Sequence, residues 1–157
     1  MTKTLQALLI ALMAVGTANA DFTGEVVGVT DGDTVTVLRD REPVKVRLTE
    51  IDAPERKQPF GQRSRQHLAD LVFRKEVLVV EHGKDRYGRT LGRLKLGAVD
   101  ANEEQIRSGM AWVYDKYVVD RSLYGLQDEA KRARRGLWAD PEPVPPWEWR
   151  RSRRGGK

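Results

Sequence analysis

The first half of the chain alternates apolar and polar positions in short runs. Three runs rich in β-branched residues follow one another with turn residues between them, at residues 22–29, 34–38 and 44–48. In the third run the apolar residues share one face and Arg47 lies on the other, as in a strand with one buried face. The pattern predicts an antiparallel meander. It directs Arg47 away from the core, unless the sheet closes into a barrel whose outer face carries a site.

Helical spacing of apolar residues predicts three helices beyond the third of these runs. They are expected at residues 62–73, 102–108 and 122–135. Gly109 and Gly136 follow the last two, and glycine is common just past the end of a helix. Two more strands are expected at residues 77–80 and 91–96, joined as a hairpin through a turn at 84–89.

Five strands and three helices make the domain mostly β with helices, an α+β class. A helix inserted after the third strand suits a small Greek-key barrel, an architecture that often binds oligonucleotides on one face. An open sheet covered by helices is the alternative, and composition does not separate the two.

Residues 1–20 have the features of a cleavable signal peptide. Lys3 gives a positive start, residues 5–15 are apolar, and residues 18–20 form a small-x-small cleavage pattern. The apolar run is too short for a membrane-spanning helix, and a lipid anchor would need a cysteine that the chain lacks. We therefore expect cleavage after Ala20 and a secreted or periplasmic mature protein with no membrane anchor.

The rest of the chain divides into one domain and a tail. Residues 21–140 suit a single hydrophobic core. Residues 141–157 contain four prolines, two tryptophans and a run of arginines. So many prolines argue against any regular element, and we expect a flexible basic tail rather than a dedicated binding arm. The two tryptophans, in contrast, favour docking onto the domain.

Composition limits the available chemistry. No cysteine is present, which excludes disulfides, cysteine–zinc sites and thiol nucleophiles, so catalysis must come from oxygen and nitrogen groups. The formal net charge of +5 suits a polyanionic partner without proving one. The histidines, His67 and His82, are most simply packing or surface residues.

Four short segments carry candidate chemistry, at residues 31–34, 47–55, 85–89 and 136–138. Each has an ordinary structural reading, since Asp-Gly between two strands is a common hairpin turn. Together they place the carboxylates of Asp33, Asp52 and Glu55 at the ends of neighbouring strands. Arg47 lies on the strand that leads into two of them. Carboxylates suit a hard cation such as Ca²⁺ or Mg²⁺, and arginines can neutralise the phosphoryl oxygens of a phosphodiester.

These segments closely resemble the motifs of the staphylococcal nuclease (thermonuclease) family, in the family's order, over residues 22–138. The resemblance implies a five-stranded OB-type Greek-key barrel with three helices, in agreement with the elements predicted above. It also implies a metal-dependent phosphodiesterase that acts on DNA and RNA. The segment between Pro54 and Gly61 is shorter than the flexible loop of the best-known member.

The resemblance further implies a calcium site. Asp33 and Asp52 match the aspartates that bind calcium in the family. The next residue would contribute its backbone carbonyl, and here it is Ala53 where the best-known member has threonine. Asp31 matches the first aspartate of its motif and is expected behind these ligands, where it could orient metal-bound water.

The groups expected to act on the substrate also follow from the resemblance. Arg47 and Arg89 match the arginines that bind the scissile phosphate. Glu55 matches the glutamate usually proposed as the base that activates water. Arg86 and Tyr87 match a basic and an aromatic residue that hold a terminal phosphate.

Aromatic residues near position 115 are the candidates for contact with a base. Tyr117 roughly matches such an aromatic, while Trp112 and Tyr114 leave open which ring faces the pocket. Stacking on an aromatic would favour unpaired bases over intact duplex.

Two functions remain as hypotheses. The first is a monomeric, exported, calcium-dependent nuclease of DNA and RNA that prefers single strands and leaves 3′-phosphate products. The second is a non-catalytic OB-fold module that binds single strands. Carboxylates retained together with the arginines favour the nuclease, because a pure binder would need the arginines alone.

Overall fold

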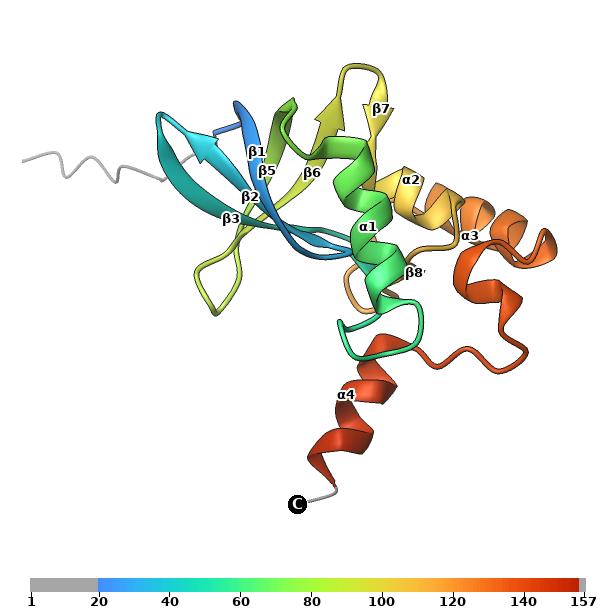
Figure 1. Ribbon diagram of the computed structural model, residues 1–157. Helices are drawn as coiled ribbons and strands as arrows, with labels where there is room; N and C mark the ends of the chain where they lie inside the picture. Colours follow the sequence, from blue (N-terminus) through green and yellow to red (C-terminus); the bar gives the residue numbers. More distant parts are fainter. Residues whose placement is uncertain (1–19, 156–157) are drawn as a thin grey trace, which may run out of the picture.

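Five strands wrap into a closed barrel in the computed structural model, which describes residues 20–155 (Figure 1). The strands are β1 (Phe22–Asp31), β2 (Thr34–Arg39), β3 (Glu42–Leu48), β5 (Glu76–Lys84) and β6 (Thr90–Leu96). Their order is β3-β2-β1-β5-β6, and a parallel pairing of β3 with β6 closes the barrel. The closure confirms the predicted barrel, and the open sheet was the wrong alternative.

Short strands that the pattern did not indicate join the barrel to the rest of the chain. β7 (Val99–Asp100) extends the sheet beyond β6, and β4 (Ile51–Asp52) pairs with β8 (Trp112–Val113). The β4–β8 pairing sets Asp52 opposite Trp112. It thereby brings the second half of the chain to one end of the barrel.

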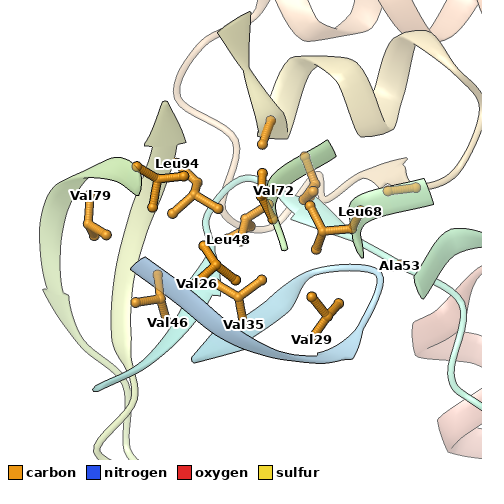
Figure 2. Packing of buried hydrophobic residues seen from close by; sticks show 14 of the residues in the cluster. Val26, Val29, Val35, Val46, Leu48, Ala53, Leu68, Val72, Val79 and Leu94 are labelled. Carbon is orange, nitrogen blue, oxygen red and sulfur yellow. The ribbon is translucent and has the colours of Figure 1, made fainter. Parts of the chain in front are cut away.

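The core fills the barrel and the space under the first helix (Figure 2). Valines and leucines of alternate strand positions point inward and are fully buried, among them Val26, Val35, Val46, Leu48 and Leu94. Helix α1 (Gly61–Val72) covers this interior with Leu68 and Val72, both at 0% exposure. Burying a side chain of this size contributes about 1.5–3 kcal/mol, so the barrel needs no disulfide to be stable.

Helices α1, α2 (Ala101–Arg107) and α3 (Ser122–Arg132) form at the three predicted places and lie on one side of the barrel (Figure 1). α3 ends before the expected stop at Gly136, because Arg134 already adopts a left-handed φ of 52°. Gly136 instead begins a 3₁₀ helix, η1 (Gly136–Ala139). A Cβ on Gly136 would lie 2.2 Å from the carbonyl oxygen of Gly109, so this glycine permits a close crossing of two segments.

A fourth helix, α4 (Pro146–Arg154), overturns the expectation that residues 141–157 contain no regular element. The prolines precede the helix or occupy its first position, where a missing N–H costs nothing. Trp147 of α4 packs against Trp112 and Tyr114, so this part of the tail is docked rather than free. Figure 1 shows α4 leading away from the body of the domain toward the C-terminus.

The predicted signal peptide, residues 1–20, lies outside the described residues except for Ala20. Among the helices between residues 20 and 155, none is long and apolar enough to cross a membrane.

Candidate active site

A cleft of about 1250 Å³ opens on the outer face of the barrel. Its walls come from the β1–β2 turn, β3, the loop after β4, the β5–β6 turn, the segment after β8, and α4. Every charged side chain that the sequence placed in the site lines this cleft: Asp31, Asp33, Arg47, Asp52, Glu55, Arg86 and Arg89. The six segments that form the walls are separate in the sequence and meet at this cleft.

The β1–β2 turn is both a hairpin and part of the site. Glycine is required at position 32 because neighbouring side chains leave no room for a Cβ. A Cβ there would lie 1.7 Å from Ser64 Oγ and 2.9 Å from the Cβ of Ala53. The Gln105 amide donates to the Gly32 carbonyl at 2.6 Å. His67 bonds the same Gln105 side chain at 2.6 Å, so its role is to support the turn.

Asp33 and Asp52 are tied to one another through Ala53 and Arg47. The Ala53 amide donates to Asp33 Oδ2 at 2.7 Å. Arg47 Nη2 lies 3.1 Å from both Asp33 Oδ2 and Asp52 Oδ1. Its Nη1 donates to the carbonyls of Leu48 and Ile51 at 2.6 and 3.0 Å. Arg47 does point away from the barrel interior, and the outer face carries the site.

Burial makes it costly to ionise the carboxyl groups of Asp31 and Asp52. Burial, together with the neighbouring charge of Asp33, raises the pKa of Asp31 to about 8. Burial also raises the pKa of Asp52, although a hydrogen bond from Arg150 acts in the opposite direction. Four carboxylates, Asp31, Asp33, Asp52 and Glu55, face the guanidinium groups of Arg47 and Arg150. The carboxylate oxygens of Asp33 and Asp52 that converge here suit a divalent cation.

The donor set fits a hard cation. Asp33 and Asp52 offer carboxylate oxygens beside the backbone of Ala53, and oxygen ligands are those that a hard cation prefers. Within residues 20–155 no group of three or more acidic, histidine or cysteine side chains is placed so that these side chains alone could hold a metal ion. Backbone carbonyl, water and substrate oxygens would have to supply the remaining ligands, which Ca²⁺ and Mg²⁺ both accept.

Glu55 lies on the loop between β4 and α1, and its side chain is 40% exposed. Its amide donates to the Gln58 side chain at 3.0 Å, which fixes the backbone of the loop. Its carboxylate accepts from Arg150 Nη1 at 2.8 Å. Glu55 thus reaches the cleft beside the two aspartates.

The β5–β6 turn forms the rim of the cleft. Asp85 accepts from the amides of Tyr87 and Arg89 at 2.9 and 3.0 Å and from Arg89 Nε at 2.7 Å. Burial opposes the shift, but these hydrogen bonds lower the pKa of Asp85. Arg86 and Arg89 both stack on the Tyr87 ring, which is 67% exposed.

Closure of the barrel explains why the two arginines predicted to bind phosphate, Arg47 and Arg89, line the same cleft. In the parallel pairing of β3 with β6, Arg47 is opposite Leu91. Arg89 lies in the β5–β6 turn, directly before β6 begins and two residues before Leu91. Arg47, Arg89 and Leu91 all line the cleft.

The aromatic candidates separate into lining and supporting rings. Tyr114 and Tyr117 line the cleft and contact one another edge to face at 4.9 Å. Trp112 packs behind them between Trp138 and Trp147. The two tyrosines, and not Trp112, are therefore the rings that can meet a base.

Sequence reasoning missed two parts of the site. Arg150 and Trp147 of α4 line the cleft, and the only sequence signal for them was the pair of tryptophans among arginines. Glu50 and Arg93 form an ion pair at 2.9 Å beneath the tyrosine segment. His82 also lines the cleft edge, although no role was expected for it.

Fold and cleft together define an OB-type barrel protein with a carboxylate–arginine site suited to a phosphate chain. Residues 45–140 match the family model described as "Staphylococcal nuclease homologue". The chain belongs to this family.

Several relatives support the assignment. "Micrococcal nuclease" of Shigella flexneri is 46% identical, over 93% of this chain and 90% of that protein. "Protein ParB" of Escherichia coli is 46% identical, over 92% of this chain and 88% of that protein. A plant protein, "Staphylococcal-like nuclease CAN1" of Arabidopsis thaliana, is 38% identical over 71% of this chain and 35% of its own length.

Proposed function

We propose that this protein is an exported, calcium-dependent nuclease that hydrolyses phosphodiester bonds in DNA and RNA. One observation carries the proposal: Arg47 Nη2 lies 3.1 Å from the carboxylates of both Asp33 and Asp52, at the end of a cleft that Glu55 also enters. A surface that only bound nucleic acid would gain nothing from acidic groups there, since they repel phosphate.

Asp33, Asp52 and the Ala53 carbonyl would hold Ca²⁺, which when bound supplies positive charge next to the phosphate. Glu55 would take a proton from the attacking water. Arg47 and Arg89 would donate to the phosphoryl oxygens as negative charge grows on them. The bond between phosphorus and the 5′-oxygen would break and this oxygen would gain a proton from water, so the phosphate would remain on the 3′ side of the cut.

A preference for single strands follows from the rim of the cleft. Tyr117 is 55% exposed and Tyr87 is 67% exposed, so both rings are available for stacking on unpaired bases. Arg86, next to Tyr87, would bind a neighbouring phosphate. Export to the periplasm or the medium rests on the signal peptide predicted at residues 1–20, and we propose that the mature protein acts as a monomer.

The direct test is incubation of the purified mature protein with single-stranded DNA. We expect cleavage in Ca²⁺, weaker cleavage in Mg²⁺ because a flexible coordination sphere is needed, and none in a chelator. Binding without cleavage under all conditions would instead identify the non-catalytic OB-fold module. Analysis of the ends of the products then tests for 3′-phosphates.

A further inference from the structure

Helix α4 places a guanidinium between two carboxylates of the active-site cleft. Arg150 Nη2 donates to Asp52 Oδ2 at 2.7 Å, and Nη1 donates to Asp52 Oδ1 at 3.2 Å. The same Nη1 donates to Glu55 Oε1 at 2.8 Å. The planar fork of arginine holds two carboxylates in a fixed geometry, which the rotating ammonium of a lysine does not provide.

Glu55 depends on this contact for its orientation. Its side chain is 40% exposed and extends from a loop. Within residues 20–155, Arg150 is the only residue that bonds the Glu55 carboxylate. A glutamate without an anchor samples several rotamers, and a base must stay within hydrogen-bond reach of the water that it deprotonates.

The position of Arg150 is itself fixed by packing. Trp147, one turn earlier on α4, stacks on Tyr114 with the ring planes 1° apart and centroids 5.5 Å apart, and it meets Trp112 edge to face at 5.7 Å. The segment before α4 is held by the Gln58 amide, which donates to the Val144 carbonyl at 2.6 Å. Gln58 also accepts from the Glu55 amide, so one side chain ties α4 to the Glu55 loop.

We propose that Arg150 is a positioning residue of the hydrolytic reaction, holding the Glu55 carboxylate beside Asp52 and toward the attacking water. The inference rests on the proposed role of Glu55 as the base. Arg150 bonds Oε1 of Glu55, which leaves Oε2 to accept the proton that the water loses as its oxygen bonds to phosphorus. Arg150 and a divalent cation can act together, because an ionised carboxylate has about four lone-pair sites and Asp52 Oδ2 accepts from Arg150 alone among the described residues.

The test is a double-mutant cycle on the full mature chain, with a short single-stranded oligonucleotide in Ca²⁺. Arg150→Met keeps the aliphatic stem and removes the fork. We expect kcat to fall roughly 10- to 100-fold with KM changed only a few-fold, since misplacing a catalytic group by about 1 Å costs this much. Glu55→Gln should lower kcat by about 10²- to 10⁴-fold. Adding Arg150→Met to Glu55→Gln should cost less than about two-fold more, because the two changes remove one function.

Two further variants separate positioning from structure and from charge. Arg150→Lys should restore part of the lost kcat, because it keeps a cation that can reach one carboxylate. Arg153→Met removes one positive charge from the same helix, where Arg153 stacks on Trp149, and should cleave within about two-fold of the parent. Melting temperatures of all variants report folding, and if Arg150→Met fails to fold, Arg150→Lys takes its place in the cycle.

Each remaining outcome counts against the inference. Equal losses from Arg150→Met in both backgrounds would mean that Arg150 acts independently of Glu55. Faster cleavage by Arg150→Met would mean that α4 inhibits the site. If Glu55→Gln cleaves slowly but its loss is independent of the loss from Arg150→Met, the inference about Arg150 fails and the proposed role of Glu55 stands. If Glu55→Gln cleaves as the parent does, the proposed base and the inference fail together.

Discussion

The Asp33 carboxylate makes three polar contacts, with Thr34, Ala53 and Arg47. Oδ1 accepts from the Thr34 hydroxyl at 3.0 Å, Oδ2 accepts from the Ala53 amide at 2.7 Å, and Arg47 lies 3.1 Å from Oδ2. A carboxylate held in this way has its orientation set by the fold, before any cation or substrate arrives. Preorganisation of this kind lets charge act on a transition state without further rearrangement.

Substitution of Gly32 should loosen this arrangement. Gly32→Ala would place a Cβ 1.7 Å from Ser64 Oγ, so the turn or α1 must move. We expect a loss of about 1–3 kcal/mol in the free energy of unfolding, measured by urea denaturation. The matched control is Gly125→Ala, because Gly125 lies in α3 and a Cβ added there would meet no atom within 4 Å. That change should stabilise the protein by about 0.4–1 kcal/mol. Equal effects of the two changes would contradict the packing argument.

Arg47→Lys tests the arginine at the centre of the site. Lysine keeps the charge but cannot bridge two carboxylates and two carbonyls as Arg47 does. We expect cleavage to fall by about 10²- to 10³-fold, the loss typical for one donor to a charged transition state. Affinity for intact single strands in Ca²⁺ should change much less. The measurement is a pair of titrations, one of cleavage rate and one of binding, and parallel losses in both would mean that Arg47 only grips the substrate.

At the scale of the elements, the segment after β8 is held to the barrel by Glu50 and Arg93. Glu50 Oε1 accepts from the amides of Val119 and Asp120 at 2.8 and 2.6 Å. Arg93 bonds Glu50 at 2.9 Å and Asp120 at 3.1 Å. The Glu50 carbonyl accepts from the Tyr114 amide at 2.8 Å. These bonds fix the segment that carries Tyr114 and Tyr117.

This network predicts a pH-dependent contribution to stability. Burial alone would raise the pKa of Glu50, but hydrogen bonds from the amides of Asp120 and Val119 and the charge of Arg93 lower it overall. Such a carboxyl stabilises the fold above its unfolded pKa of roughly 4.3, and the contribution is lost as pH falls through the lower folded pKa. Glu50→Gln should therefore cost about 1–3 kcal/mol at neutral pH and progressively less below about pH 4. Urea denaturation of both proteins across this range checks it, and a difference that did not change with pH would count against the ion pair.

The local sequence pattern was enough to predict most helices and strands. It did not predict contacts between segments that are far apart in the chain. The β-branched runs and apolar spacing predicted the barrel strands and α1 to α3, because each reflects burial against one core. Arg150 lies 95 residues from Glu55, and no local pattern reports such a contact. The prolines before α4 were read as breakers of structure, although the helix begins at Pro146, the position where proline is tolerated. Asp33, Arg47, Asp52 and Glu55 were identified from their positions at the ends of the predicted strands, the family resemblance gave their expected roles, and the structure adds that they share a cleft.

At the scale of the whole molecule, the cleft lies where the barrel, the rim turn and α4 meet. Asp33 comes from the β1–β2 turn, Arg47 from β3 and Asp52 from β4, while the β5–β6 turn supplies Arg89 and α4 supplies Arg150. A net charge of +5 favours approach of a nucleic acid, while the carboxylates of Asp33, Asp52 and Glu55 would repel a phosphate unless a cation lies beside them. Activity should therefore depend on a divalent cation even though the protein as a whole is basic.

The measurement that tests this account most directly is cleavage of a single-stranded oligonucleotide as a function of Ca²⁺ concentration. The parent protein is compared with Asp33→Asn and Asp52→Asn, which keep the shape of each side chain and remove its charge. We predict that the parent shows no cleavage in chelator and saturates with Ca²⁺, while both variants need far more Ca²⁺ or stay inactive. Full cleavage by the parent in chelator, or identical Ca²⁺ titrations for folded variants and parent, would contradict the account.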